Sequence, residues 1–313
     1  MPSGGTLLCL ASAASFGAMG IFGKLAYEEG ATVGTLLAAR FVLAAALFWL
    51  FVTSSGGARD VRALPRRDVG TALALGAVAY SAQAGGYFAA LQRLDASLLS
   101  LLVYTFPTIV TATAIALGRE RANRRTAVAL ALASTGLVLV LAGAGAGALD
   151  PIGTGLGLAA AVVYSAYILA SEGVVERIGP IALSTLVCTG AATTLTLAGV
   201  ARGDLDPGSV SAAGFGWLAG IAVVSTVGAV GLFFAGLQRV GPTAASILST
   251  LEPVVTVALA FLVFGESLGP VPLAGGALVL AAVLAVRAPV RLAPSDRQIR
   301  SPAGLPKGRT THV

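Results

Sequence analysis

Long apolar runs alternate with short polar breaks along this chain. A helix that crosses a bilayer needs roughly 20 mostly apolar residues at a rise of about 1.5 Å per residue. Runs of this kind predict ten spanning helices, at residues 6–26, 33–53, 70–92, 96–117, 125–143, 153–172, 181–199, 213–237, 243–263 and 270–288. The first run looks partly like a signal peptide, but it has no Lys or Arg before it and continues through Ala26, so we expect an uncleaved helix.

The two halves of the chain repeat one pattern. Residues 85–120 and 231–266 align at a constant offset of 146, with twelve identities in thirty-six positions. The shared residues include a Gln-Arg pair, a proline within an apolar run and a final glutamate, which are Gln92, Arg93, Pro107 and Glu120 and their mates Gln238, Arg239, Pro253 and Glu266. Duplication within an apolar chain is typical of transporters built from two related halves.

A Gly/Ala-rich linker at 143–151 separates five predicted helices from five. Because five is odd, the second half must lie inverted relative to the first. We therefore expect one repeat at 1–147, an inverted repeat at 148–288, and a disordered basic tail at 289–313.

The distribution of Lys and Arg predicts an orientation. If the N-terminus is cytoplasmic, sixteen of these residues fall in inner segments and three, Lys24, Arg93 and Arg202, in outer ones. This asymmetry favours a cytoplasmic membrane protein with both termini inside the cell.

Composition supports a lipid environment. Hydrophobic residues make up 56% of the 313 residues and charged residues 11%, against about 25% charged in soluble domains. The net charge of +6 does not indicate nucleic acid as a partner, because the basic residues lie in loops and in the tail. We expect a small-molecule substrate and the bilayer as partners, and a homodimer is compatible with such a chain.

Enzyme signals are absent from the sequence. The single histidine is His312 in the tail, which excludes a His-based triad or zinc site in the body, and no phosphate-binding Gly-x-x-x-x-Gly-Lys loop occurs. The two cysteines, Cys9 and Cys188, lie in apolar runs and read as small hydrophobic residues. We expect neither enzymatic activity nor a cofactor or metal.

Glu252 is the most informative polar residue, since it lies near the middle of a predicted span. A carboxylate there costs about 2.5–3.5 kcal/mol, so it should face the bundle interior or water. It is either a proton carrier or cavity wall, or a protonated structural group bonded to a neighbouring helix. Pro253 beside it and its mate Pro107 each remove a helical hydrogen bond at symmetry-related positions, which favours a shared hinge or site.

Other polar residues in the predicted helices are substrate-binding candidates. Lys24 either extends to the outer headgroups or serves the site, whereas Arg40 is deeper and should have an internal partner or an anionic ligand. Stripes of polar and aromatic residues at helical spacing line a cavity or join helices. These candidates are Tyr80, Gln83, Tyr87, Ser100, Tyr104, Thr108, Tyr164, Tyr167, Ser246, Ser249 and Thr250.

The chain resembles the drug/metabolite transporter superfamily, EamA type. The resemblance rests on Gly23-Lys24-Leu25-Ala26 followed by Ala39-Arg40-Phe41, and on the segments 235–240, 249–255, 264–268 and 275–278, which contain Gln238-Arg239, Glu252-Pro253 and Gly265-Glu266. It extends over about residues 6–288. It implies a ten-helix bundle around a central cavity, with the fifth and tenth helices peripheral.

The same resemblance implies alternating-access transport of small metabolites, often outward, with amino acids and related compounds among the substrates. A membrane-embedded enzyme that acts on lipid and a membrane scaffold without transport are the alternatives. Coupling to protons, facilitative transport and exchange all remain open.

Overall fold

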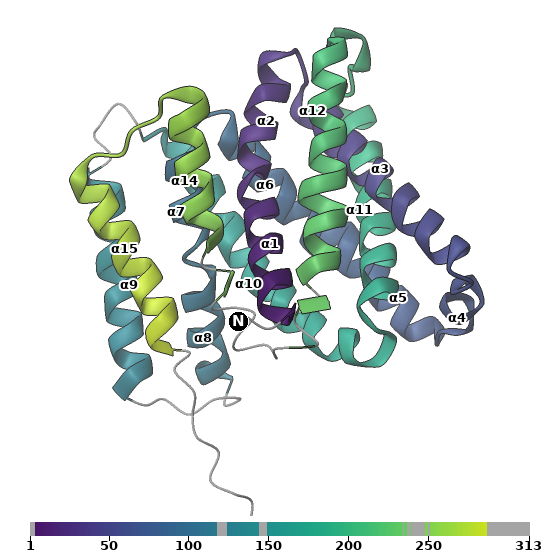
Figure 1. Ribbon diagram of the computed structural model, residues 1–313, viewed down its shortest axis with the longest axis horizontal. Coiled ribbons are helices and arrows are strands. Elements are labelled where there is room, and N and C mark those ends of the chain that lie inside the picture. Colours follow the sequence, from purple (N-terminus) through teal and green to yellow (C-terminus); the bar gives the residue numbers. More distant parts are fainter. Residues whose placement is uncertain are drawn as a thin grey trace, which may run out of the picture.

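The computed structural model describes residues 4–117, 124–143, 149–233, 235–236, 239, 248–249 and 251–286 (Figure 1). Helices dominate these ranges, and no strand occurs among them. The predicted tail at 289–313 and the candidates Ser246 and Thr250 lie outside the described residues.

The first half forms five spans. Their helices are α1 (Gly4–Gly17), α2 (Met19–Glu28), α3 (Val33–Ser54), the short α4 (Ala58–Ala63), α5 (Arg66–Ala74), η1 (Leu75–Tyr80), α6 (Ser81–Leu91), α7 (Ala96–Val103), α8 (Phe106–Ala116) and α9 (Arg124–Gly143). The first span consists of α1 and α2, the third of α5, η1 and α6, and the fourth of α7 and α8.

The second half follows the same order. Its helices are α10 (Pro151–Ile178), α11 (Pro180–Arg202), the single turn η2 (Pro207–Ser209), α12 (Ala212–Ala222), η3 (Val223–Gly228), α14 (Leu251–Phe264) and α15 (Pro270–Val286). The eighth span consists of α12, η3 and the helical residues that follow η3.

Five of the described helical segments are long and apolar enough to cross a membrane: Gly4–Glu28, Val33–Ser54, Pro151–Ile178, Pro180–Arg202 and Ala212–Phe233. Shorter apolar helices include Leu251–Phe264 and Pro270–Ala282. With the repeat in the sequence, these helices define an all-α, ten-helix membrane protein, as predicted.

Helix packing follows the symmetry of the repeat. The first span packs against the eighth and ninth, through α2 with α12 and α1 with α14. Its mate α10 packs against the third and fourth spans, through α6, α7 and α8. The first helix of each half therefore lies against the opposite half, and the two halves form one body.

The second and seventh spans, α3 and α11, are symmetry mates that pack together in opposite directions. Gly34 at the start of α3 donates its N–H to Asp204, just past the end of α11, at 2.8 Å. Toward the other end of α3, Trp49 Nε1 donates to Thr189 Oγ1 at 3.0 Å. Antiparallel mates are what an inverted repeat requires.

The fifth and tenth spans, α9 and α15, pack against each other at one edge of the bundle (Figure 1). A Cβ on Gly136 would lie 2.6 Å from the carbonyl oxygen of Gly275, and a Cβ on Gly275 would lie 2.6 Å from that of Gly136. These two backbones approach so closely because neither residue has a side chain. The peripheral pair agrees with the expectation from the resemblance.

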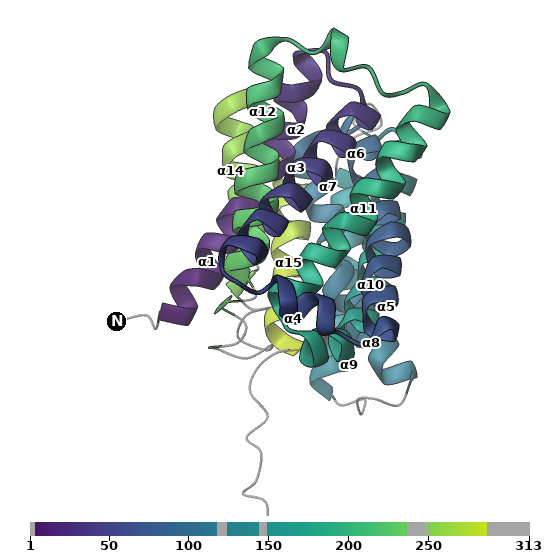
Figure 2. The same cartoon turned by 90° about the vertical axis from the view of Figure 1, so that its right-hand side faces the viewer.

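Side-chain caps fix several helix starts. Thr32, Asp150 and Ser211 accept hydrogen bonds from backbone N–H groups in the first turns of α3, α10 and α12. Figure 2 shows the connection from α11 to α12 passing across the top of the bundle, at the end where α2 and α3 meet. Near this end, the ring of Trp217 in α12 stacks on Phe22 in α2, with centroids 5.9 Å apart.

The third and eighth spans each contain a π-helical segment, η1 and η3. Within or just after each segment, a hydroxyl donates to a carbonyl five residues earlier: Ser81 to Gly76 at 2.8 Å and Thr226 to Ile221 at 3.0 Å. Such wide turns displace a side chain from its ordinary helical position, and they often occur at functional sites.

The fourth span departs from the prediction of one helix at 96–117. It breaks at Tyr104 and Thr105, between α7 and α8, and Pro107 lies at the start of α8. In the ninth span Ser249 forms a turn, and Pro253 is the third residue of α14. The prolines therefore lie in the first turns of half-helices, where their missing N–H is tolerated, and not in the middle of continuous helices.

Candidate functional site

The break in the fourth span is joined to the start of α14 in the ninth. In an uninterrupted helix the N–H of residue 253 would bond to the carbonyl of Ser249, and Pro253 has no N–H. The hydroxyl of Tyr104, at the end of α7, donates a hydrogen bond to this carbonyl oxygen. The break in the second half is thus joined directly to the break in the first.

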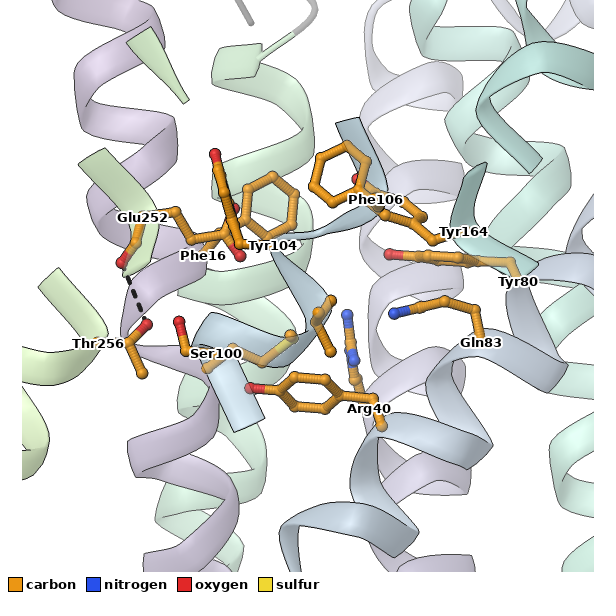
Figure 3. Close-up of a pocket in the computed structure, with 13 residues that line it drawn as sticks. Phe16, Arg40, Tyr80, Gln83, Ser100, Tyr104, Phe106, Tyr164, Glu252 and Thr256 are labelled. Atoms are coloured by element: carbon orange, nitrogen blue, oxygen red, sulfur yellow. Dashed lines mark hydrogen bonds between the residues drawn. The ribbon is translucent and has the colours of Figure 1, made fainter. Parts of the chain in front are cut away.

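A small cavity lies beside this junction (Figure 3). Its lining residues come from the first, second, third, fourth, sixth and ninth spans: Phe16, Met19, Arg40, Tyr80, Gln83, Tyr87, Ser100, Val103, Tyr104, Phe106, Tyr164, Glu252 and Thr256. Its volume of about 50 Å³ accommodates a few water molecules, whereas a drug-sized ligand occupies about 300 Å³ or more.

A basic and an acidic side chain line different walls of the cavity. Arg40 lies with Gln83 and Tyr80 on one side, and Glu252 lies with Thr256 and Phe16 on the other (Figure 3). The ion pairs between described residues join Lys24, Arg93 and Arg177 to carboxylates, and none of them includes Arg40 or Glu252. A polar solute between the two walls would face a guanidinium on one side and a carboxyl on the other.

Aromatic rings form a continuous wall beside the cavity. The ring of Phe41 contacts Tyr80, Tyr80 stacks on Tyr167, and Tyr167 stacks on Tyr164. Phe106 then contacts both Tyr164 and Tyr104, with centroids 4.7 and 5.4 Å apart. The wall therefore links α3, the third span, α10 and the break in the fourth span, and it offers an apolar surface to a bound molecule.

Glu252 lies in the first turn of α14, where a helix N-terminus favours negative charge. Thr256, one turn later, donates to the carbonyl oxygens of Gly17 at 3.0 Å and Glu252 at 3.1 Å. A Cβ on Gly17 would lie 2.8 Å from the Glu252 carbonyl oxygen. Close packing of α1 on α14 therefore holds the backbone of Glu252 in place.

A second polar cluster lies at the end of the bundle where α2 and α14 end. Lys24 Nζ lies 2.7 Å from a carboxylate oxygen of Glu266 and 3.6 Å from Asp95. Glu266 also accepts from the backbone N–H groups of Ala96 and Ser97 at 3.2 and 3.0 Å, and from the Ser97 hydroxyl at 2.9 Å. Glu266 therefore caps α7 and ties the first, fourth and ninth spans together.

The environment of Glu266 sets its ionisation. Burial opposes the charged form, but the hydrogen bonds from Lys24 and Ser97 outweigh burial and hold its pKa below the ordinary value of 4.5. The carboxylate is therefore ionised at neutral pH, in a pair with the Lys24 ammonium.

An open pocket of about 690 Å³ lies next to this cluster. It is lined by Lys24, Tyr27, Glu28, Leu91, Gln92, Arg93, Leu94 and Asp95. We call it the outer pocket, in keeping with the predicted orientation. Lys24 and Asp95 connect the outer pocket to the Glu266 cluster.

The structure gathers most of the predicted site residues in one place. Arg40, Tyr80, Gln83, Tyr87, Tyr104, Tyr164 and Glu252 line the cavity, as does Ser100. Ser249 and Pro253 lie in the adjacent break without lining it, and the side chain of Pro107 is outside the described part. Lys24 does not extend alone to the headgroups and does not line the cavity, because Glu266 holds it in an ion pair.

Sequence reasoning missed the apolar part of the lining. Phe16, Met19 and Val103 are ordinary apolar residues of apolar helices and carry no signal of their own. Thr256 could have been predicted from the sequence, because it follows Glu252 by four residues and therefore lies on the same helix face.

Comparison with known proteins agrees with this architecture. The EamA-like transporter family matches this chain twice, over residues 3–142 and 151–288. The chain belongs to that family and is a multi-pass membrane transporter.

Individual proteins show the same similarity. A Bacillus subtilis (strain 168) protein named "Uncharacterized transporter YcbK" is 28% identical over 286 residues, which cover 87% of this chain and 88% of that protein. One crystal structure of a protein shares the fold with a TM-score of 0.64 at 19% identity, over 91% of this chain and 97% of that one.

Proposed function

We propose that this protein is a secondary transporter that moves small metabolites, amino-acid-like compounds among them, outward across the cytoplasmic membrane by alternating access. The observation that carries the proposal is the cavity itself. Residues from both inverted halves line it beside the breaks in the fourth and ninth spans, with Arg40 and Glu252 on different walls. Sites at such breaks between inverted repeats are where alternating-access transporters bind their substrates.

A thin barrier between the cavity and the outer pocket supports alternating access. Tyr87 lines the cavity and Leu91 lines the outer pocket, four residues further along α6. The corresponding residues of α2 are Met19 and Lys24. At about 1.5 Å per residue, these separations place roughly 6–8 Å of protein between the two spaces.

The barrier consists of contacts that can separate without unfolding a helix. A Cβ on Gly20 would lie 3.0 Å from the Tyr87 hydroxyl, and one on Gly23 would lie 2.7 Å from the Phe88 ring. The glycines let α2 lie close against α6, and the Lys24–Glu266 pair ties the end of α2 to Glu266, which caps α7. Movement of α2 away from α6 would join the cavity to the outer pocket.

The volume of the cavity supports an occluded state. About 50 Å³ is too small for a metabolite, so substrate binding requires the walls to move apart. We assign the outer pocket to the external face and both termini to the cytoplasm, following the excess of Lys and Arg in the predicted inner segments.

Solute counterflow in proteoliposomes tests the transport function. Purified protein is reconstituted in vesicles preloaded with one unlabelled metabolite, and uptake of the same labelled metabolite is followed across a broad panel. We expect transient accumulation of at least one amino-acid-like compound, with empty vesicles as the control. Turnover of a lipid without solute flux would instead support the membrane enzyme, and neither activity would support the scaffold.

Thiol accessibility tests alternating access. Cys9 and Cys188 are replaced by Ala, and Ser100→Cys then places a single thiol in the cavity wall. We expect a membrane-impermeant maleimide to label it from either side of the membrane, in proportions that a transported solute changes. Ser211→Cys, on the connection before α12, is the control that should react from one side only. A cavity thiol that also reacts from one side only under all conditions contradicts the mechanism.

Glu252→Gln tests the carboxyl group. If Glu252 carries protons, this variant loses the dependence of flux on a pH gradient while solute binding persists. Glu28→Gln, in the outer pocket, is the matched control. Unaltered flux with unaltered pH dependence would assign Glu252 a structural role.

A further inference from the structure

Arg40 is a buried cation within the second span. It lies in the middle part of α3, and 2% of its surface is exposed. A guanidinium inside a membrane bundle needs compensation by an anion or by several hydrogen-bond acceptors. The groups around it therefore indicate whether the protein itself supplies that compensation.

The described side chains that contact Arg40 carry no charge, and Tyr80, through its hydroxyl, is one of them. Its Nε donates to the hydroxyl of Thr226 at 2.9 Å. Its guanidinium carbon lies 4.7 Å from the ring centroid of Phe41 and 5.5 Å from that of Phe88. Both ring contacts are cation–π interactions, and no described carboxylate forms an ion pair with Arg40.

Arg40 lines the cavity, and its guanidinium lies on the same side as Gln83 (Figure 3). Thr226 engages Nε from outside the cavity lining, and the terminal nitrogens Nη1 and Nη2 lie at the far end of the guanidinium. These two nitrogens form a planar fork that matches the two oxygens of a carboxylate. The geometry thus presents a carboxylate-binding group to the cavity.

Thr226 positions this group. It belongs to the π-helical segment η3, and its hydroxyl donates its proton to the carbonyl of Ile221 at 3.0 Å. With its only proton committed there, the hydroxyl can only accept from Arg40. The π-helix of the eighth span therefore fixes the direction of an arginine that belongs to the second span.

We propose that Arg40 binds a carboxylate group of the transported compound and that Thr226 is its positioning residue. This inference rests on the proposed function and names the chemical class of the substrate. Arg40 is the one basic side chain among the described lining residues, and a carboxyl group, Glu252, lies on a different wall, so a compound with a second carboxylate would find no second cation there. The site therefore favours compounds with one carboxylate, with or without an ammonium group.

Matched pairs of acids and amides test the carboxylate. The melting temperature of the purified full chain in detergent is measured with acetate and acetamide, L-alanine and L-alaninamide, L-leucine and L-leucinamide, and L-phenylalanine and L-phenylalaninamide. We expect at least one acid to raise the melting temperature and its amide not to do so. Comparison of acetate, which has no amine, with the three amino acids distinguishes a site for simple monocarboxylates from a site for amino acids. Stabilisation by the amides alone, or by no acid of the set, overturns the inference.

Variants locate the effect at Arg40. Arg40→Gln should weaken binding of the stabilising acid on the order of tenfold to a hundredfold, and Arg40→Lys should retain part of the affinity. Arg93→Gln, in the outer pocket, is the matched control and should bind normally. Unchanged affinity in Arg40→Gln rejects the site.

Thr226→Val tests the positioning role without removing charge. We expect weaker binding of the acid in Thr226→Val and recovery in Thr226→Ser, which keeps the hydroxyl. Equal affinity in all three proteins would assign Thr226 a packing role and overturn that part of the inference. If either Arg40 variant fails to fold, this series still tests the site.

Counterflow separates failure of this inference from failure of the proposed function. Unchanged flux of a carboxylate-bearing solute in Arg40→Gln keeps the transporter and rejects the carboxylate site. If the wild-type chain transports no solute of the panel, the proposed transport function is rejected, and the assignment of Arg40 to a transported carboxylate is rejected with it.

Discussion

The hydroxyl of Tyr104 donates a hydrogen bond to the carbonyl oxygen of Ser249, across the boundary between the two halves of the chain. The same carbonyl also accepts from the backbone N–H of Glu252 at 3.0 Å, whereas Pro253 has no N–H to offer it. A tyrosine of one half thus adds a donor to a carbonyl beside the proline of the other half. Tyr104 is also a lining residue, so this bond joins the cavity wall to the ninth span.

Tyr104→Phe should destabilise the junction. Loss of the hydroxyl removes one hydrogen bond to the Ser249 carbonyl, which keeps the Glu252 N–H as a donor, and this costs about 0.5–1.5 kcal/mol. We expect a lower melting temperature in detergent, whereas Tyr164→Phe, which changes another tyrosine of the same wall, should cause a smaller decrease. Equal decreases in the two variants would show that the bond to Ser249 contributes no special stability.

Pro253→Ala should lower the transport rate without loss of stability. Alanine supplies the missing N–H, so a helical bond to Ser249 can replace the tyrosine and stiffen the break. We expect counterflow to slow several-fold while the melting temperature stays constant or rises. Pro180→Ala, at the start of α11 away from the breaks, is the control. Full transport by Pro253→Ala would mean that the break does not need its proline.

Glu266→Gln should reduce stability in a pH-dependent manner. The folded-state pKa of Glu266 lies below its ordinary value of 4.5, so the carboxylate stabilises the fold fully above that value, and the contribution is lost as the pH falls through the folded pKa. Melting temperatures of the wild type and the variant should differ at neutral pH and converge at lower pH. Asp95→Asn, whose side chain is 57% exposed, should have little effect at any pH. A constant difference across this range would contradict the role of the charge.

Gly76→Ala should destabilise the contact between the third and seventh spans. A Cβ at this position would overlap the carbonyl of Val187, and one at Gly190 in α11 would overlap that of Leu73. Because a backbone must move to relieve the clash, we expect a loss of about 1–3 kcal/mol, measured as a lower melting temperature. Gly85→Ala is the matched control, since nothing lies within 4 Å of its Cβ, and it should be neutral.

The apolar pattern predicted the helices, and the repeat predicted their inverted arrangement. The breaks in hydropathy that fall on described residues correspond to loops or helix ends, because lipid leaves the backbone few alternatives to a helix. The break at Tyr104 and Thr105 was not predictable in the same way. Both residues lie within an apolar run, and the nearby proline indicates a perturbation without showing on which side the helix ends.

Charge explains which part of the candidate site was visible in the sequence. Arg40 and Glu252 stand out because a charged residue within a span is expensive and needs a reason. The partner of Lys24 did not stand out, since Glu266 is 242 residues away and only the folded bundle brings the two together. The role of Thr226 was equally unpredictable, because it depends on a π-helical turn, and no residue type indicates such a turn.

The two tryptophans have a practical consequence for watching this protein at work. Trp217 stacks on Phe22 near the end that carries the outer pocket, and Trp49 bonds to Thr189 toward the opposite end. The chain contains no other tryptophan. Its tryptophan fluorescence thus comes from one residue toward each end of the bundle. Replacing one tryptophan with phenylalanine would leave the other to report on movement at its own end.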